Sequence, residues 1–348
     1  MRKLFVCIAL GLTTLTGNAA SPLWMRDVQI SPDGTEIAFC YKGDIYKVSA
    51  GGGTAIQLTT QPSYECTPIW SPDSKQIAFA SDRNGNFDIF VMPATGGTAQ
   101  RLTTHSSSEL PSTFTPDGKY ILFSASIQDP SQSALFPTTA MTELYKVPVN
   151  GGRTEQVLGT PAEAVCYAPS GEFLLYQDRK GFEDEWRKHH TSSITRDIWL
   201  YDTKTGKHTN LTNHAGEDRN PVLSPDGKSV YLLSERKGSF NVYSFPLDNA
   251  QDLKAVTSFK THPVRFLSMS HGGTLCYAYD GEIYTQKDNA TPQKINIDIV
   301  RDDQDKIADL TFTNGATSGT VSPDGKQIAF IVRGEVFVTS TDYATTKQ

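Results

Sequence analysis

The residues of this 348-residue chain whose side chains could do chemistry form no recognised catalytic arrangement. Gly315-Ala-Thr-Ser-Gly319 is not a Gly-x-Ser-x-Gly nucleophile elbow, because its serine has the wrong spacing and the segment precedes a predicted strand. The sequence contains no His-Glu-x-x-His helix and no Cys-x-x-Cys pair. We therefore predict no catalytic residue, no cofactor and no metal site in this chain.

One polar segment has the spacing of calcium ligands. Asp82, Asn84, Asn86 and Asp88 place side-chain oxygens at alternate positions, as a calcium-binding loop does. The segment lies between two predicted strands and contains Gly85. A hairpin turn therefore explains it better than a calcium site.

Charged and aromatic side chains are densest at about residues 180–196. This segment contains Phe182-Glu-Asp-Glu-Trp186-Arg-Lys-His189-His190. Trp186 offers a surface for stacking, and Arg187 or Lys188 offers a partner for carboxylates, which suits a site that contacts a polypeptide. A metal site formed by the two histidines is disfavoured, because adjacent residues on an extended strand point to opposite faces.

These residues are positioned by a tetrapeptide that recurs along the chain. Ser-Pro-Asp-Gly, or a close variant, starts at residues 31, 71, 115, 168, 224 and 322, and a worn copy starts at 270, so the spacing is 40 to 56 residues. Pro sets φ at the first turn position, Asp suits the second, and Gly adopts the left-handed conformation that lets the next strand return. Four short runs of β-branched and aromatic residues accompany a copy of the turn. This period is typical of a β-propeller with one four-stranded blade per repeat.

We predict an all-β chain with a six-bladed propeller over residues 21–299, a linker over 300–315 and the truncated first blade of a second propeller over 316–348. The seventh copy ends at Lys347-Gln348 within a predicted strand, so we expect a truncated reading frame. An alternative is one seven-bladed propeller, in which residues 21–27 supply the last strand and remove an exposed edge. The predicted blades are Val28–Thr60, Cys66–Thr104, Ser112–Gly159, Ala164–Thr212, Asn220–Ser258 and Val264–Ile299, with a further copy from Ala316.

Two insertions fall in the same connection, between the second and third strands of neighbouring blades, at about residues 126–141 and 180–196. Equivalent connections emerge on one face of a propeller, so we predict a shared rim, joined by His105, His214 and His262 from other turns on that face. The alternative is a solvated loop whose aromatic side chains pack on its own blade. The candidate residues for contact with a peptide or protein partner are Trp186, Arg187, Lys188, His189, His190 and Phe136.

The first 20 residues have the features of a secretory signal. Arg2 and Lys3 precede the apolar run Leu4–Leu15, and Asn18-Ala19-Ala20 offers small residues for cleavage. The run is too short to span a membrane, so we predict an exported protein, periplasmic or secreted, with no membrane span. A net charge of −6 and the lack of a basic stripe disfavour nucleic acid as a partner.

Four cysteines remain after the predicted cleavage, and each lies on a predicted strand. Because they are spread over different blades, we expect buried thiols that act as small hydrophobic side chains. The alternative is a disulfide, which the oxidising compartment would permit. The four are Cys40, Cys66, Cys166 and Cys276.

The repeat PIWSPDSKQIAFASDRNGNFDIFVMPATGGTAQRLT, residues 68–103, resembles the propeller repeats shared by the TolB and tricorn protease families. Pro22–Phe39 and Gly181–Asp202 specifically resemble exported bacterial tricorn-like peptidases. The resemblance covers essentially the whole mature chain. It implies a six-bladed propeller, then a seven-bladed propeller, a PDZ-like module and a serine peptidase core. None of the family's catalytic residues carries over, because that core would lie beyond Gln348.

The resemblance implies a non-catalytic propeller portion of a tricorn-like serine peptidase that guides or gates peptide substrates. Its ligand would be a peptide or protein at the channel or rim of the propeller, and the full-length enzyme would be a homo-oligomer. The alternative is a free-standing periplasmic protein-binding scaffold similar to TolB. A third hypothesis, a propeller coupled to a hydrolase domain, requires a Gly-x-Ser-x-Gly motif downstream of this sequence.

Overall fold

Every regular element in the described part of the chain is a β-strand. The computed structural model describes residues 22–127, 141–181, 183–287, 290–300, 314–343 and 346–347. Runs of β-branched and aromatic residues form the strands, and residues such as Gly, Pro and Asp form the turns between them. In these ranges, no helix has the length and apolar character needed to cross a membrane.

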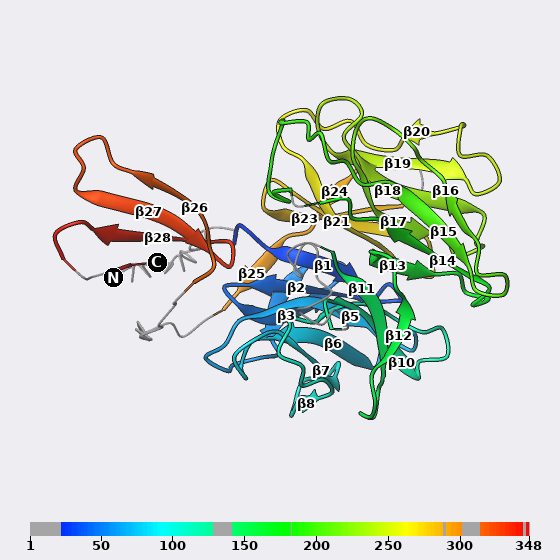
Figure 1. The fold of residues 1–348 in the computed structure, drawn as a ribbon, viewed down its shortest axis with the longest axis horizontal. Helices are drawn as coiled ribbons and strands as arrows, with labels where there is room; N and C mark the ends of the chain where they lie inside the picture. Colours follow the sequence, from blue (N-terminus) through cyan, green and yellow to red (C-terminus); the bar gives the residue numbers. More distant parts are fainter. Residues whose placement is uncertain are drawn as a thin grey trace, which may run out of the picture. The chain divides into compact units, whose positions relative to one another are not determined.

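The chain divides into two units, Met1–Arg301 and Asp302–Gln348. The first unit holds six sheets, blades 1 to 6, each built from four consecutive antiparallel strands (Figure 1). Blades 1 to 3 consist of β1 (Arg26–Ile30), β2 (Glu36–Tyr41), β3 (Asp44–Ser49), β4 (Gly53–Gln57); β5 (Glu65–Trp70), β6 (Gln76–Ser81), β7 (Asp88–Pro93), β8 (Gln100–Arg101); and β9 (Leu110–Phe114), β10 (Tyr120–Ala125), β11 (Glu143–Pro148), β12 (Glu155–Leu158). Blades 4 to 6 consist of β13 (Glu163–Tyr167), β14 (Phe173–Gln177), β15 (Ile198–Asp202), β16 (His208–Asn210); β17 (Asp218–Leu223), β18 (Ser229–Ser234), β19 (Asn241–Pro246), β20 (Lys254–Ala255); and β21 (Val264–Met269), β22 (Thr274–Tyr279), β23 (Glu282–Lys287), β24 (Gln293–Lys294).

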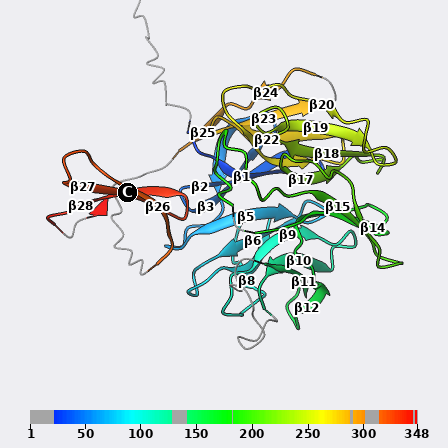
Figure 2. The ribbon, with the colours of Figure 1, turned by 45° about the horizontal axis from the view of Figure 1, so that its top comes forward.

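The first strands of the six sheets form a closed ring. β1 contacts β5, and the contacts continue through β9, β13, β17 and β21 back to β1. The sheets of the first unit are grouped around these inner strands (Figures 1 and 2). The β-propeller predicted from the repeat is confirmed, and the ring closes with six blades.

The hydrophobic core lies between neighbouring blades. Ala38 and Cys40 of blade 1 pack with Ile77 and Phe79 of blade 2, and a corresponding cluster fills each of the other five spaces around the ring, including the one between blades 6 and 1. A middle strand is therefore covered on both faces, which explains continuous apolar runs such as Ile-Ala-Phe at 77–79.

The repeated turn is held by its serine and its aspartate together. In blade 1 the Ser31 hydroxyl donates to Asp33 Oδ1 over 2.6 Å, and Asp33 Oδ1 also accepts from the Thr35 N–H over 2.9 Å. These hydrogen bonds hold the pKa of Asp33 below its usual value. Gly34 has φ of 77°, which explains the glycine at this position. The same Ser/Thr–Asp contact recurs in blades 2, 3 and 5 and in the second unit.

A short strand after blade 6 returns to blade 1. Blade 6 was predicted to continue to Ile299, but its last strand ends at Lys294, and β25 (Ile297–Ile299) pairs in parallel with β4. Ile297 lies opposite Gly53, and Ile295 and Ile297 are buried against blade 1. This segment, residues 295–299, therefore links the last blade to the first, and we call it the closing segment.

The second unit is one four-stranded sheet. Its strands are β26 (Ala316–Val321), β27 (Gln327–Val332), β28 (Glu335–Ser340) and β29 (Thr346–Lys347). Phe330 and Phe337 stack with ring centroids 5.8 Å apart, as Phe79 and Phe90 of blade 2 do at 5.9 Å. The sheet therefore has the internal construction of a propeller blade.

One buried carboxylate lacks the arginine that its counterpart has. Glu65 and Glu109 occupy the same repeat position, directly before or at the start of the first strand. Glu65 is fully buried and accepts from Arg83 over 3.1 Å and from Ser81 over 2.7 Å. Glu109 is equally buried, but among the described residues it forms no ion pair and its Oε2 has no hydrogen-bond partner. In blade 3, Ile127 stands where Arg83 stands in blade 2.

We expect the substitution Glu109→Gln to stabilise the protein above neutral pH. Burial raises the pKa of Glu109 from 4.5 to about 7, so the folded state holds this proton more tightly than the unfolded state. The contribution of Glu109 to stability is then greatest below pH 4.5 and is lost as the pH rises to about 7. At pH 8 the variant should gain about 1–3 kcal/mol in the free energy of unfolding.

Urea unfolding at several pH values between 5 and 8 measures this effect. The matched variant Glu65→Gln should lose about 1–3 kcal/mol, because it removes the buried charged acceptor of the partly buried Arg83. Two substitutions at the same repeat position then change stability in opposite directions. A loss of stability in both variants at pH 8 would contradict the assignment of Glu109 as an uncompensated carboxylate.

Candidate functional site

The insertion between β14 and β15 of blade 4 leaves its own blade and contacts three others. Arg187 forms ion pairs with Glu217 and Glu235 of blade 5. Trp186 lies against Phe266 of blade 6 with ring centroids 5.9 Å apart. The Arg26 guanidinium of blade 1 lies over the same indole, 5.3 Å from its centroid. The insertion therefore extends across the face of the ring on which the inner strands begin.

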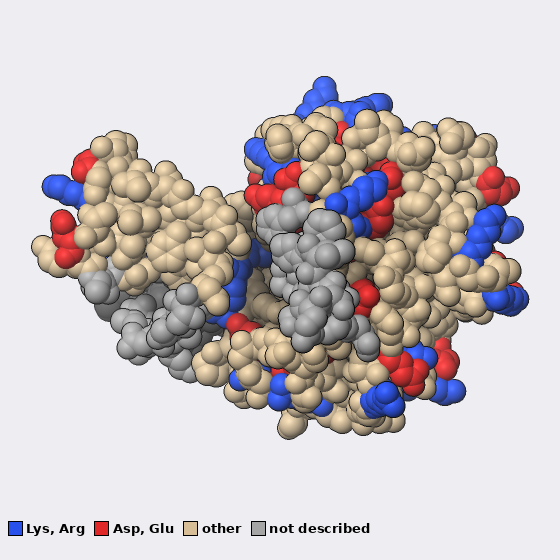
Figure 3. Space-filling view, viewed as in Figure 1, with Lys and Arg blue, Asp and Glu red and all other residues tan. Residues whose placement is uncertain are grey.

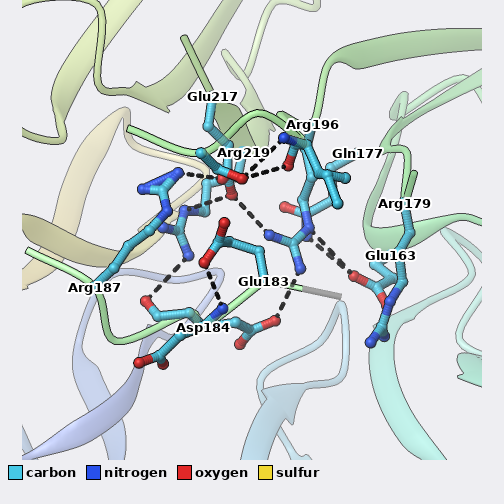
Figure 4. A network of polar contacts seen from close by, with 12 residues as sticks. Glu163, Gln177, Arg179, Glu183, Asp184, Arg187, Arg196, Glu217 and Arg219 are labelled. Carbon is cyan, nitrogen blue, oxygen red and sulfur yellow. Dashed lines mark hydrogen bonds and ion pairs between the residues drawn. The ribbon is translucent and has the colours of Figure 1, made fainter. Parts of the chain in front are cut away.

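Glu217 is the centre of a buried charge network (Figure 4). This carboxylate is fully buried directly before β17, where Arg187 Nη2, Arg196 Nη1 and Arg219 Nε all approach it. The Arg196 and Arg219 contacts measure 2.8 and 3.3 Å. Glu235 accepts from Arg187 Nη1 over 2.7 Å. Two arginines of the insertion, Arg187 and Arg196, are thus paired with carboxylates of blade 5.

The network includes cations from two sources. Arg187 and Arg196 come from the insertion, whereas Arg219 comes from the inner strand of blade 5. The guanidinium groups of Arg187 and Arg219 lie 5.2 and 4.0 Å from the centroid of the buried Phe240 ring. Burial of this many charges is tolerated only where each is paired, so the network fixes one position of the insertion.

Every inner strand of the ring has a bulge at the same place. In five blades the bulged residue has φ between 46° and 58°, a strained conformation for side chains larger than glycine. Blade 3 has Pro111 there, whose ring excludes positive φ. A bulge redirects the neighbouring side chains. The five left-handed residues are Asp27, Thr67, Ala164, Asn220 and Phe266.

The residue directly before this bulge is arginine in blades 5, 6 and 1, which are neighbours in the ring. These residues, Arg219, Arg265 and Arg26, are named the arginine trio here. Arg265 donates to the main-chain carbonyls of Glu185, over 2.5 Å, and of Trp186, over 2.9 Å. Its guanidinium also lies 5.1 Å from the Trp186 ring centroid, so two arginines of the trio contact this indole.

The structure gives the candidate contact residues different surroundings. Trp186 is 45% exposed, whereas Arg187 is buried and paired with carboxylates of its own chain. Lys188, His189 and His190 are exposed, and Phe136 and Phe182 lie outside the described residues. The histidines of the other turns are held by local contacts: His105 and His214 accept from nearby N–H groups, and His262 contacts Asp280.

Both aspartates of the calcium-like segment have protein partners. Asp82 Oδ1 accepts from the Tyr64 N–H over 2.8 Å, and Asp88 pairs with Arg101 over 2.7 Å. Gly85 has φ of 109°, as a turn glycine does. Among the described residues, His, Cys, Asp and Glu form no cluster of three that could hold a metal ion.

The four cysteines that the structure describes are free thiols, two of them buried and two partly buried. Burial raises the pKa of each, to about 11 for Cys166. A thiol with a raised pKa forms little thiolate and is a poor nucleophile. These residues pack as small hydrophobic side chains and add no chemistry to the site.

The insertion was predictable from the sequence, but the residues on which it lies were not. Glu217, Arg219, Arg265 and Arg26 were not singled out. Aligning the repeats on their turns places the three arginines in one column, five residues before the Ser of the turn, and this was the available signal. Nothing in the sequence marks Glu217 as buried, because the insertion that covers it begins at about residue 180, in another blade.

The ring of four-stranded sheets defines a β-propeller protein. The sequence model of the tricorn protease N-terminal beta propeller domain matches residues 22–292, and the chain belongs to this family. The tricorn protease homolog of Saccharolobus solfataricus is 27% identical over 210 residues, which cover 58% of this chain and 18% of the relative. This chain thus spans less than a fifth of the length of that relative.

Solved structures show the same fold. The crystal structure of the tricorn protease matches with a TM-score of 0.66 at 21% identity, over 94% of this chain and 31% of that one. TolB from Acinetobacter baumannii matches with a TM-score of 0.56 at 19% identity, over 78% of this chain and 62% of that one. At these identities the matches establish the fold and not the activity.

Proposed function

We propose that this chain is the non-catalytic propeller portion of an exported tricorn-like serine peptidase, and that it binds peptides and guides them toward or away from a peptidase core. Membership of the tricorn N-terminal propeller family supports the attachment to a peptidase. The signal-like residues 1–20, which lie outside the described residues, support export.

The observation that carries the proposal is the way the ring holds its own insertion. The hydrogen bonds of Arg265 to the insertion go to three successive main-chain carbonyls, those of Glu185, Trp186 and Arg187. Main-chain recognition does not depend on sequence, which suits a protein that handles many peptides.

We further propose that residues 316–348 form the first blade of a second propeller. The sheet β26–β29 has the turn and the stacked phenylalanines of a blade. Val321 and Val336 are each more than half exposed, whereas the middle strands of blades 1 to 6 are covered on both faces. A neighbouring blade would cover these apolar side chains.

A binding and cleavage assay with the full chain tests the proposed function. Labelled unstructured peptides are incubated with the protein, retention is measured by fluorescence anisotropy, and the peptides are then analysed by mass spectrometry. We expect binding without hydrolysis. Hydrolysis that a point mutation in this chain abolishes would contradict the proposal. Retention of a folded envelope protein but of no peptide would favour the TolB-like scaffold instead.

A further inference from the structure

The arginine trio is a feature of the repeat and not of the insertion. Arg26, Arg219 and Arg265 occupy one column of the repeat alignment on three neighbouring inner strands, each directly before a left-handed residue. The corresponding residues of blades 2, 3 and 4 are Cys66, Leu110 and Glu163, so the cations occupy one half of the ring. Half of the ring thus presents guanidinium groups at a common level.

What these arginines contact is a short peptide segment, Glu185–Arg187. Arg265 donates to its three carbonyls over 2.5, 2.9 and 3.0 Å, and Arg219 Nη1 donates to the Glu185 carbonyl over 3.4 Å. The guanidinium groups of Arg26 and Arg265 both lie over the Trp186 indole, in the geometry of two cation–π contacts. The segment has no regular secondary structure. It lies on the trio as a bound peptide would.

The charges of Arg265 and Arg219 are only partly offset by carboxylates of the described residues. Among the described residues, Arg265 forms no ion pair with a carboxylate, and the buried Nη2 of Arg219 has no hydrogen-bond partner. Burial, followed by the neighbouring Arg219, lowers the pKa of Arg265 to about 10, while Glu185 and Asp184 oppose this effect. An occupant with acidic residues is therefore favoured, and the insertion supplies the sequence Glu183-Asp-Glu-Trp186.

We propose that the arginine trio is a binding site for short peptide turns in which acidic residues precede an aromatic one, and that Glu185–Arg187, part of a turn in which the Arg187 N–H donates to the Asp184 carbonyl over 3.3 Å, occupies this site in cis. The inference rests on the proposed function, since it names where and by what chemistry a peptide is bound. The ion pairs of Arg187 with Glu217 and Glu235 are a separate attachment that keeps the occupant nearby.

The covalent connection of Glu185–Arg187 to blade 4 determines how tightly a free peptide must bind to displace this segment. A segment held by a short connection competes at an effective concentration on the order of millimolar. A peptide of similar intrinsic affinity therefore binds the wild-type chain poorly. Weakening the cis occupant without changing the trio exposes the site.

The experiment uses the full chain and a fluorescein-labelled decapeptide with the sequence of residues 181–190, GFEDEWRKHH, followed by fluorescence anisotropy. The variant Trp186→Ala should bind this probe at least tenfold more tightly than the wild type does. Adding Arg265→Gln to that variant should remove at least tenfold of the affinity. The matched control, Arg153→Gln in the same background, changes an exposed arginine of blade 3 and should leave binding unchanged.

Thermal unfolding followed by circular dichroism shows that each variant is folded, and Arg26→Gln replaces Arg265→Gln if the latter fails to fold. If the Trp186→Ala variant binds the probe equally well with and without the arginine substitution, the probe binds elsewhere and the inference is overturned. The proposed function would still stand in that case. If neither this probe nor any unstructured peptide binds any variant, both proposals are wrong. A probe with Trp replaced by Ala that binds equally well overturns the aromatic requirement.

Discussion

Replacing Glu217 by glutamine is expected to lower the free energy of unfolding by about 3–5 kcal/mol. The fully buried carboxylate is approached by Arg187, Arg196 and Arg219, and the neutral amide offers one acceptor oxygen in place of two charged ones. Removing one member of a buried ionic network leaves the remaining charges desolvated and unpaired, which is the main source of the cost. The effect is large because three cations depend on one group.

Urea unfolding of the full chain at pH 7 measures this loss, and two comparisons make it specific. Glu172→Gln removes an exposed ion pair with Lys204 whose length, 2.6 Å, is no greater than the 2.8 Å between Arg196 and Glu217. This control should change the free energy of unfolding little, because exposed ion pairs contribute little to stability. Trp186 fluorescence reports the position of the insertion, since the network holds this segment on blade 5. A variant as stable as the wild type would show that the network is not paired as described.

The fold was predictable because the repeated turn is determined locally. Ser31, Asp33 and Gly34 satisfy one another through hydrogen bonds within six residues, so the signal in each repeat does not depend on the rest of the chain. The number of blades could not be read from the repeats alone, because ring closure depends on a contact between β1 and β21, which are about 240 residues apart. The role of the closing segment was missed, since the three residues of β25 do not show on which blade they lie.

The site was predictable only in part. Its insertion departs from the repeat in length and composition, which made Trp186 and Arg187 visible as candidates. The role of Arg187 was not visible, because its partners Glu217 and Glu235 belong to another blade and only burial distinguishes them from surface acids. An acidic residue in a buried network and one in an exposed ion pair are therefore expected to differ by several kcal/mol in their effect on the free energy of unfolding. Tertiary packing decides to which of the two groups an acidic residue belongs.

The other large effect is expected at Gly52, where the closing segment lies directly against the chain. Gly52 has φ of 90°, and a Cβ added there would lie 2.5 Å from the main-chain oxygen of Asn296. A main-chain atom cannot rotate away as a flexible side chain would, so Gly52→Ala must displace the closing segment or the turn before β4. That displacement would break the hydrogen bond from the Gly53 N–H to the Asn296 carbonyl, which is 2.9 Å long.

We expect Gly52→Ala to lower the free energy of unfolding by about 2–4 kcal/mol, of which roughly 1–2 kcal/mol is the cost of alanine at positive φ. Gly53→Ala is the matched control. It has φ of 112° but no atom within 4 Å of the added Cβ, so it carries the backbone strain without the clash. The difference between the two variants measures what the closing segment contributes. Hydrogen exchange should locate that difference at β4 and β25. Equal losses of stability in both variants would mean that backbone strain alone is responsible and that ring closure depends on the core between blades 6 and 1.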